Sequence, residues 1–496
     1  MKACIVNCAE YPSLLKTIKN MVVNGKLSVE KIIDYSEYES MYGSFHGEFV
    51  SFYDHIRLRS DKSIEHEYRY LSQGAISFAE KFQKTAIDIL IFRHVRPGVY
   101  FKSDEATALF YSSLNRSIFE IQSNKLELII FNHIPHHFNT FVLYVAAKFL
   151  NVKTLMVTKM SWNGFRYFLD TNVGERGWSI KNKIQCSGFV MDEDRLQIEA
   201  IRSRINYSPP LYMSRQYRRK LVSFLSKYCS GFILFHVGIA IYGGFEVGFF
   251  KRMPCHFKWF HKDRYDSEMY PLKLFQVASQ IKDKFKIQML AKIYSKLSST
   301  LNKFSNLDYV LFAPNYQPEA TTLPSALYFS DILLCIKLLR SRIPEEIFIF
   351  YKEHEDIFNI NLEANRCRSK SFYDDILKIK NLIIVDRKSN QIELIDNSKF
   401  VVIQTSNIGL EAAVRGKSVL SFGPTWFDNF YNVMRWSEFD EINGYQKMVS
   451  LNVSENFNDK ILADINKYTV RLEDSDKLEE VAMQMEGLFT EALMLP

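Results

Sequence analysis

The stretch YVLFAPNYQPEATT, residues 309–322, decides the fold of this chain. Its first five residues form an apolar run that predicts a buried strand. Pro314 and Asn315 end the run, and the polar segment 316–322 follows it. Ligands bind at the carboxyl ends of the strands in open α/β sheets, so this segment is expected at a binding edge. Taken alone, it also fits an ordinary polar loop with a capping threonine.

Apolar runs and helical patterns alternate regularly from residue 305 onward. Strands are predicted at 309–313, 347–351, 381–385, 400–404 and 418–422, and helices at 325–342, 371–379, 390–397 and 407–415. Gly416 directly follows the last of these helices, where a C-cap favours glycine. This alternation predicts a parallel sheet with helices on its faces.

The first half of the chain shows a similar but less regular pattern. Strands are predicted at 2–7, 86–92, 126–131 and 154–157, and a helix at 138–150. The last two strands and the helix form a βαβ unit. Residues 203–304 are expected to be helical and basic. Two α/β units joined in this way predict the GT-B arrangement, in which two Rossmann-like domains face a central cleft.

Length and composition fit two globular domains. The chain has 496 residues, 47% apolar and 24% charged, which exceeds a single hydrophobic core. We expect an acceptor-side domain at 1–304 that includes the basic region, a nucleotide-sugar domain at 305–475, and a helix at 476–496 that packs back on the first domain.

The expected compartment is the cytoplasm. Seven scattered cysteines form no CxxC pair, which favours reduced thiols, and the N-terminus lacks the apolar core of a signal peptide. The apolar stretch 231–250 contains His236, Glu246 and a Gly243-Gly244 break, which favour buried structure over a membrane span.

The net charge of +7 is concentrated in two basic clusters. One comprises Arg215, Arg218, Arg219 and Lys220, and the other lies within 251–264 among aromatic residues. A solvated face and peripheral contact with an anionic membrane both fit this pattern. We expect no nucleic-acid partner, because no RNP, zinc-finger or helix-turn-helix signature accompanies the charge.

Four predicted strand ends in the second half supply polar groups. They are, in chain order, Gln317, Glu319, Thr321 and Thr322; Lys352 and His354; Thr405, Ser406 and Asn407; and Gly423. A lysine charge, a histidine proton and a helix N-terminus together suit a phosphate. Glu411, about one turn into the helix, is expected to bind ribose hydroxyls, and Gly423 to allow close approach of a base. Each group alone also fits a solvated loop or a simple cap.

Four runs within this region carry a family resemblance. They are FAPNYQPEATT (312–322), YKEH (351–354), SFY (371–373) and QTSNIGLEAAVRGKSVLSFG (404–423). Together they resemble the bacterial capsule and surface-polysaccharide biosynthesis family, which includes the β-Kdo transferases. The resemblance covers roughly residues 305–430 and implies a GT-B glycosyltransferase that uses a CMP-activated ulosonic acid. Glu355 departs from the family pattern, which has proline there, and its carboxylate would oppose a donor phosphate unless it points outward.

The first half is expected to bind the acceptor. His133, His136 and His137 follow the predicted strand 126–131, and a general base, a helix cap and a metal site are all open readings. No carboxylate or cysteine stands at ligand spacing, so we predict no metal. Arg93 and His94 follow another predicted strand and suit a carboxylate on donor or acceptor.

These residues predict a glycosyltransferase that transfers Kdo or a nonulosonate from a CMP donor to a surface polysaccharide or glycolipid. Glu319 is expected to position the sugar or act as the catalytic carboxylate, His354 to discharge CMP, and His136 to deprotonate the acceptor. No cofactor is expected. A nucleotide-sugar epimerase and a non-catalytic capsule assembly or export factor remain alternatives.

Overall fold

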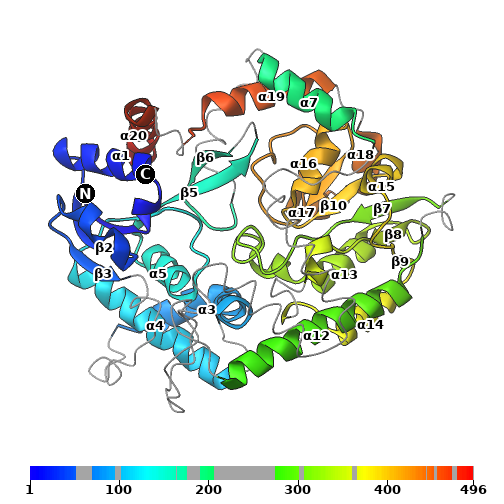
Figure 1. Cartoon of the computed structure of the whole chain (residues 1–496), viewed down its shortest axis with the longest axis horizontal. Coiled ribbons are helices and arrows are strands. Elements are labelled where there is room, and N and C mark those ends of the chain that lie inside the picture. The colour runs from blue at the N-terminus through cyan, green and yellow to red at the C-terminus, as the bar shows by residue number, and fades with distance from the viewer. Residues whose placement is uncertain are drawn as a thin grey trace.

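The computed structural model describes residues 1–51, 70–94, 102–162, 165–175, 190–205, 274–300, 307–359, 366–442, 444–451, 455–471 and 477–494. Two six-stranded sheets form the centres of two α/β halves (Figure 1). Both basic clusters and the stretch 231–250 lie outside the described residues. Within the described part, no helix is long and apolar enough to cross a membrane.

The first sheet has the strand order β3-β2-β1-β4-β5-β6. Its strands are β1 (Lys2–Val6), β2 (Ser28–Asp34), β3 (Glu48–Ser51), β4 (Leu128–Phe131), β5 (Lys153–Ser161) and β6 (Phe165–Asp170). All neighbours pair in parallel except β5 and β6. The strands predicted at 2–7, 126–131 and 154–157 are confirmed.

Helices cover this sheet, and one of them replaces a predicted strand. The helices are α1 (Pro12–Val23), α3 (Gln73–Ile89), α4 (Ser103–Ser123) and α5 (Phe138–Phe149). The strand predicted at 86–92 is wrong, because this run ends α3 and continues as a π-helix, Leu90–His94. Ala79, Ala86 and Ile89 are buried at helical spacing, and a short apolar run does not distinguish a strand from a buried helix.

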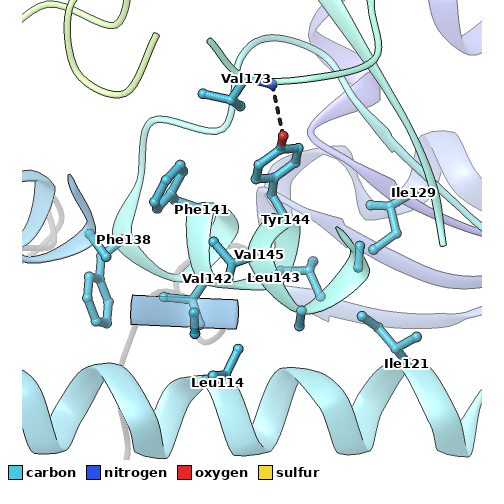
Figure 2. Packing of buried hydrophobic residues seen from close by; sticks show 14 of the residues in the cluster. Leu114, Ile121, Ile129, Phe138, Phe141, Val142, Leu143, Tyr144, Val145 and Val173 are labelled. Carbon is cyan, nitrogen blue, oxygen red and sulfur yellow. Dashed lines mark hydrogen bonds between the residues drawn. The ribbon is translucent and has the colours of Figure 1, made fainter. Parts of the chain in front are cut away.

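Figure 2 shows how α5 packs on α4 in the first core. Leu114 and Ile121 of α4 and Phe141 and Val142 of α5 are buried in one cluster. Tyr144 is buried among them, and its hydroxyl accepts a hydrogen bond from the backbone N–H of Val173 at 2.9 Å. This bond satisfies a polar group that would be costly to bury alone.

The second sheet is entirely parallel, with the order β12-β11-β10-β7-β8-β9. Its strands are β7 (Tyr309–Phe312), β8 (Phe348–Tyr351), β9 (Leu382–Ile384), β10 (Val401–Ile403), β11 (Val419–Ser421) and β12 (Val433–Arg435). The first five are the predicted strands. Counted within each half, both sheets follow the order 3-2-1-4-5-6 of the Rossmann fold, so the predicted α/β class with two Rossmann-like domains is confirmed.

The helices of the second half lie close to their predicted positions. They are α13 (Ile332–Arg342), α14 (Lys370–Leu377), α15 (Gln391–Asn397) and α16 (Asn407–Val414). The helix predicted at 325–342 begins later, because the Asp331 side chain accepts a hydrogen bond from the Leu334 N–H and caps α13 there. Gly416 has φ +82°, the left-handed conformation that glycine favours directly after a helix C-cap, which here is Arg415.

The C-terminal helix α20 (Leu478–Met494) lies beside α1 of the first half (Figure 1). Val481, Met485 and Phe489 are buried in the same cluster as Leu14 and Ile18. In the other direction, α7 (Asp192–Arg202) packs on α16 and α19 (Glu455–Lys467) of the second half. The chain therefore crosses between the two halves more than once.

Candidate functional site

The switch point of the second sheet lies between β7 and β10, where the strand order reverses. Asn315 connects the loops that leave these two strands. Its Oδ1 accepts a hydrogen bond from the Thr405 N–H at 3.0 Å, and its Nδ2 donates to Glu319 Oε2 at 3.3 Å. Ligands in open α/β folds bind at this point, so the geometry places the candidate site at the predicted edge.

The start of α16 contributes polar atoms to the switch point. Ser406 caps the helix, because its Oγ accepts a hydrogen bond from the Ile408 N–H at 3.4 Å. Thr405 Oγ1 and Gln404 Oε1 are buried without a hydrogen-bond partner among the described residues. Buried polar atoms are nearly always paired, so two unpaired atoms beside a helix N-terminus are suited to a bound polar group. Asn407 is exposed at the first position of the helix.

The loop after β8 places Lys352 and His354 near the same edge. Lys352 is buried, and its ammonium has no hydrogen bond or ion pair to a described residue. Burial lowers the pKa of Lys352, and the Glu355 carboxylate partly opposes this effect. His354 Nδ1 accepts a hydrogen bond from the Asp356 N–H at 3.2 Å, which leaves the proton on Nε2. Nε2 can therefore donate to an oxygen of a ligand.

Glu355, which departs from the family pattern, is exposed in the first turn of a 3₁₀ helix, Glu355–Phe358. His354 caps that turn. The exposed position allows the Glu355 side chain to remain solvated, while its charge still acts on Lys352.

A buried ion pair, which the sequence did not reveal, lies beneath His354. Glu353 and Arg368 side chains are 0% and 1% exposed, with Arg368 Nε donating to Glu353 Oε2 at 2.8 Å. The hydroxyls of Tyr351 and Tyr373 also donate to this carboxylate, at 2.7 and 3.1 Å. The sequence does contain a signal for the buried carboxylate. In an extended segment after β8, alternation predicts that Glu353 points to the side opposite Lys352 and His354.

Arg368 connects this ion pair to the loop after β7. Its Nη1 donates to Gln317 Oε1 at 2.8 Å, and Gln317 Nε2 donates to the Ser330 carbonyl at 2.6 Å. The predicted donor-binding amide of Gln317 is therefore already engaged at both ends. Thr322 is also engaged, since its Oγ1 donates to the Glu319 carbonyl at 3.0 Å, whereas Thr321 is exposed.

Gly423 and Glu411 both contact other residues of the chain itself. A Cβ on Gly423 would lie 2.5 Å from the methyl of Thr405 and 2.9 Å from the Cβ of Ala326, so the glycine allows close packing of the protein itself. Glu411 is buried, and its Oε1 accepts a hydrogen bond from Arg204 Nη1 at 2.9 Å. Burial raises the pKa of Glu411, and the charge of Arg204 opposes the shift.

Arg93 joins the first half of the chain to the loop after β7. Its Nη1 donates to the Leu323 carbonyl at 3.4 Å. Burial lowers the pKa of Arg93 to about 10, and the nearby charge of Glu319 opposes this effect. Arg93 and Glu319, predicted for opposite sides of the cleft, therefore lie close together. His94 ends the π-helix, and its side chain is outside the described part of the structure.

Three histidines follow β4 and form one cluster. The ring centroids of His133 and His136 lie 4.2 Å apart, and those of His136 and His137 lie 4.5 Å apart. Nδ1 of His133 and of His136 each lies 2.9 Å from the Ile134 carbonyl. Burial lowers the pKa of His133 to about 4, with the Arg93 charge as a further cause, and lowers that of His136 well below its usual value. Both rings are therefore neutral at pH 7, with Nε2 available as an acceptor.

The loops at the carboxyl ends of β4 and β7 both lie close to Arg93. The histidines lie at the carboxyl end of β4, and Glu319 lies beyond the carboxyl end of β7. Arg93 of the first half donates to the Leu323 carbonyl in the loop after β7, and its charge acts on both groups, so the carboxyl ends of the two sheets face each other beside Arg93. Among the described residues, no group of three or more His, Cys, Asp or Glu side chains is arranged to hold a metal ion.

Comparison with known protein families gives a match for one segment of the chain. Residues 328–430, about a fifth of the chain, match the family described as "Capsule polysaccharide biosynthesis protein". The match includes the loops with Lys352, His354, Thr405 and Ser406, and it begins after the QPEAT stretch. No curated protein matches the chain.

Solved structures give distant similarities. The β-Kdo 2,7-transferase KpsC of Thermosulfurimonas dismutans is 17% identical, with 42% of this chain and 62% of that chain covered and a TM-score of 0.23. A β-Kdo 2,4-transferase structure of the same protein is 13% identical, with 37% and 54% covered and a TM-score of 0.23. The UDP-GlcNAc 2-epimerase of Neisseria meningitidis is 11% identical, with both chains fully covered and a TM-score of 0.21.

The chain thus spans about half to three fifths of the two transferase structures, and with TM-scores this low nothing about its activity follows from them. The family match rests on the second sheet, where the sequence motifs and the polar strand ends coincide. Over residues 328–430, the predicted resemblance to the capsule polysaccharide biosynthesis family is therefore confirmed.

Proposed function

We propose that this protein is a glycosyltransferase of capsule or surface-polysaccharide synthesis that transfers an ulosonic acid from a CMP donor to a glycan or glycolipid. The observation that carries the proposal is the position of Lys352, His354, Thr405 and Ser406. All four lie within the family match and at the carboxyl edge of the second sheet. A cation, an N–H donor, an unpaired hydroxyl and a helix N-terminus suit a single phosphate group.

In the proposed reaction, the bond between the anomeric carbon of the sugar and the phosphate oxygen of CMP breaks. The electron pair leaves with CMP, and the added negative charge is stabilised by Lys352 and by the Nε2–H of His354. An acceptor hydroxyl forms the new glycosidic bond and loses its proton to a base. Glu319 and His136 are the two candidates for that base, because both lie near Arg93 where the sheets face each other.

The strongly lowered pKa of His136 makes it a weak base in the resting protein. Glu319 is exposed and hydrogen-bonded to Asn315, so it can reach an acceptor hydroxyl without being desolvated first. We therefore propose Glu319 as the catalytic carboxylate and His136 as a group that orients the acceptor.

The proposal also requires a metal-independent reaction, since protein cations hold the one phosphate. Activity that disappears with EDTA and returns with Mg²⁺ would contradict this part of the proposal. Peripheral contact with an anionic membrane is a further proposal, and it depends on the basic clusters outside the described residues. Binding to vesicles with and without anionic lipid tests it.

The test of the donor class is thermal unfolding with CMP, UDP, UMP and GDP. CMP at 100 times its Kd should stabilise the protein by about 2.7 kcal/mol, and the other nucleotides should give much smaller shifts. Release of CMP from CMP-Kdo only in the presence of acceptor glycan supports a transferase. Turnover of a nucleotide sugar without acceptor would instead indicate an epimerase, and no turnover with any acceptor would favour an assembly factor.

A further inference from the structure

A cavity of about 210 Å³ lies between the two halves of the chain. It does not include Lys352 or His354. One wall comes from α3 and the π-helix, and the other from the loop after β7 and the starts of α13 and α14. Its lining residues are Lys84, Asp88, Phe92, Gln317, Pro318, Leu323, Ser330, Asp331, Ile332, Cys367, Arg368 and Phe372.

The polar groups of the cavity carry both signs of charge. Lys84 Nζ pairs with Asp88 Oδ2 at 2.6 Å on α3. Asp331 stands opposite, at the N-cap of α13. Burial raises the pKa of Asp88, and the charge of Asp331 contributes to the same shift. Both carboxylates line the same cavity although they come from different halves of the chain.

Aromatic and apolar side chains complete the lining. Phe92 comes from the first half and Phe372 from the second. The guanidinium carbon of Arg368 lies 4.8 Å from the centroid of the Phe372 ring, which holds that ring in place. Carboxylates accept hydrogen bonds from vicinal hydroxyls, and flat rings pack against C–H faces, so this combination suits a sugar ring.

Size and charge restrict the ligand. Pockets for drug-sized ligands are usually about 300–1,000 Å³, so this cavity is too small for a CMP-sugar and fits a single sugar residue. Lys84 is paired with Asp88 and Arg368 with Glu353, so the Asp331 carboxylate, which has no ion pair to a described residue, leaves the lining with a net negative charge that opposes a phosphate or an acidic sugar. A neutral hexose has hydroxyls that donate to Asp88 and Asp331 and accept from Lys84.

We propose that this cavity binds a neutral sugar residue of the acceptor glycan. The inference rests on the proposed transferase function and specifies its acceptor. Gln317 and Pro318 form one wall of the cavity and also belong to the loop that holds Glu319. A sugar bound there places the next residue of the glycan beside the switch point.

Saturation-transfer NMR tests the proposal with methyl β-galactoside and methyl α-glucoside as neutral probes and free Kdo as an acidic probe. The blocking variant is Lys84→Trp, which adds bulk at a side chain that is 59% exposed and should fold normally. Asp331→Asn removes a charge and keeps an N-cap for α13. Asp374→Asn, on the exposed face of α14, is the matched control.

We expect saturation transfer to at least one neutral glycoside and much less to Kdo. Transfer should be lost in Lys84→Trp, fall about 5-fold or more in Asp331→Asn, and persist in the control. Stabilisation by CMP should remain unchanged in Lys84→Trp. Three results would overturn the proposal. They are saturation transfer that persists in both cavity variants, failure of both glycosides to bind, and stronger binding of Kdo than of the glycosides. Glycoside binding without any response to CMP would keep the sugar site and reject the CMP-dependent transferase.

Discussion

Replacing Glu353 by glutamine tests the ion pair that supports the candidate site. The carboxylate accepts from Arg368 through both oxygens, Nε to Oε2 at 2.8 Å and Nη2 to Oε1 at 3.1 Å. Glutamine keeps the shape but has one acceptor oxygen, so its NH₂ group must face a guanidinium donor. Arg368 remains charged and loses its counter-charge. Water cannot compensate for this loss, because the Arg368 side chain is 1% exposed.

Breaking a buried pair in this way costs about 3–5 kcal/mol. For a cooperative unit of about 150–250 residues, each kcal/mol lowers the unfolding midpoint by about 2–4 °C. The second domain should therefore unfold about 6–20 °C earlier in Glu353→Gln. Catalysis should fall as well, since the His354 N–H donates to Glu353 Oε1 at 3.2 Å and Arg368 holds Gln317.

Differential scanning calorimetry measures the midpoint, and Asp374→Asn is the control. Asp374 pairs with Lys370 on the surface, and an exposed pair of this kind contributes little to stability. The double variant Glu353→Gln/Arg368→Met removes the uncompensated charge and should recover part of the loss. A midpoint for Glu353→Gln within 2 °C of wild type, a threshold set well below the expected shift of about 6–20 °C, would refute the reasoning.

Three further predictions concern the site itself. His354→Ala should lower turnover about 10²–10³-fold by removing one donor to the leaving phosphate, with the fold intact by circular dichroism; near-normal CMP release would move the phosphate site elsewhere. Glu411→Gln keeps an acceptor for Arg204 and removes a carboxylate whose pKa burial raises, so the midpoint should change little; if Glu411 also binds ribose, CMP affinity falls by about 1–3 kcal/mol in titration calorimetry, and unchanged affinity rejects the ribose role. The folded pKa of His133 is about 4, below an unfolded value of about 6.5. The buried neutral ring therefore costs the folded state no protonation energy above pH 6.5, and the free energy of unfolding decreases as pH falls from about 6.5 toward 4. His133→Gln should therefore flatten the decline in urea stability over this window by up to about 1.4 kcal/mol per pH unit, and an unchanged slope would show that His133 titrates normally.

The second domain was largely predictable because most residues of its strands are buried and the helices α13, α14, α15 and α16 have side-chain caps. Apolar runs such as 347–351 stand between polar segments, and the caps Asp331, Ser369 and Ser406 begin the helices after three of them. In the first domain, the run 86–92 is apolar except for Asp88, and Ala86, Ile89 and Leu90 are buried, so its composition resembles that of a strand.

The carboxyl edge of the site was predictable, but the partners of its residues were not. Alternation predicts that Glu353 points away from Lys352 and into the core, where a carboxylate requires a cation. Nothing local identifies Arg368, which lies fifteen residues later in the sequence. In the same way, Arg415 stands four residues after Glu411 and is its local candidate partner, whereas the tertiary fold brings Arg204 from the segment after α7 to the Glu411 carboxylate.

The charge balance of the facing edges agrees with an anionic donor. The imidazoles of His133 and His136 are neutral at pH 7, since burial and the charge of Arg93 lower their pKa values. Arg93 and Lys352 supply positive charge at these edges, although burial lowers the pKa values of both. A negatively charged phosphate or carboxylate that binds beside them favours their charged forms and raises both pKa values again. Binding of such a donor should therefore be accompanied by proton uptake above neutral pH, which a neutral nucleoside would not produce.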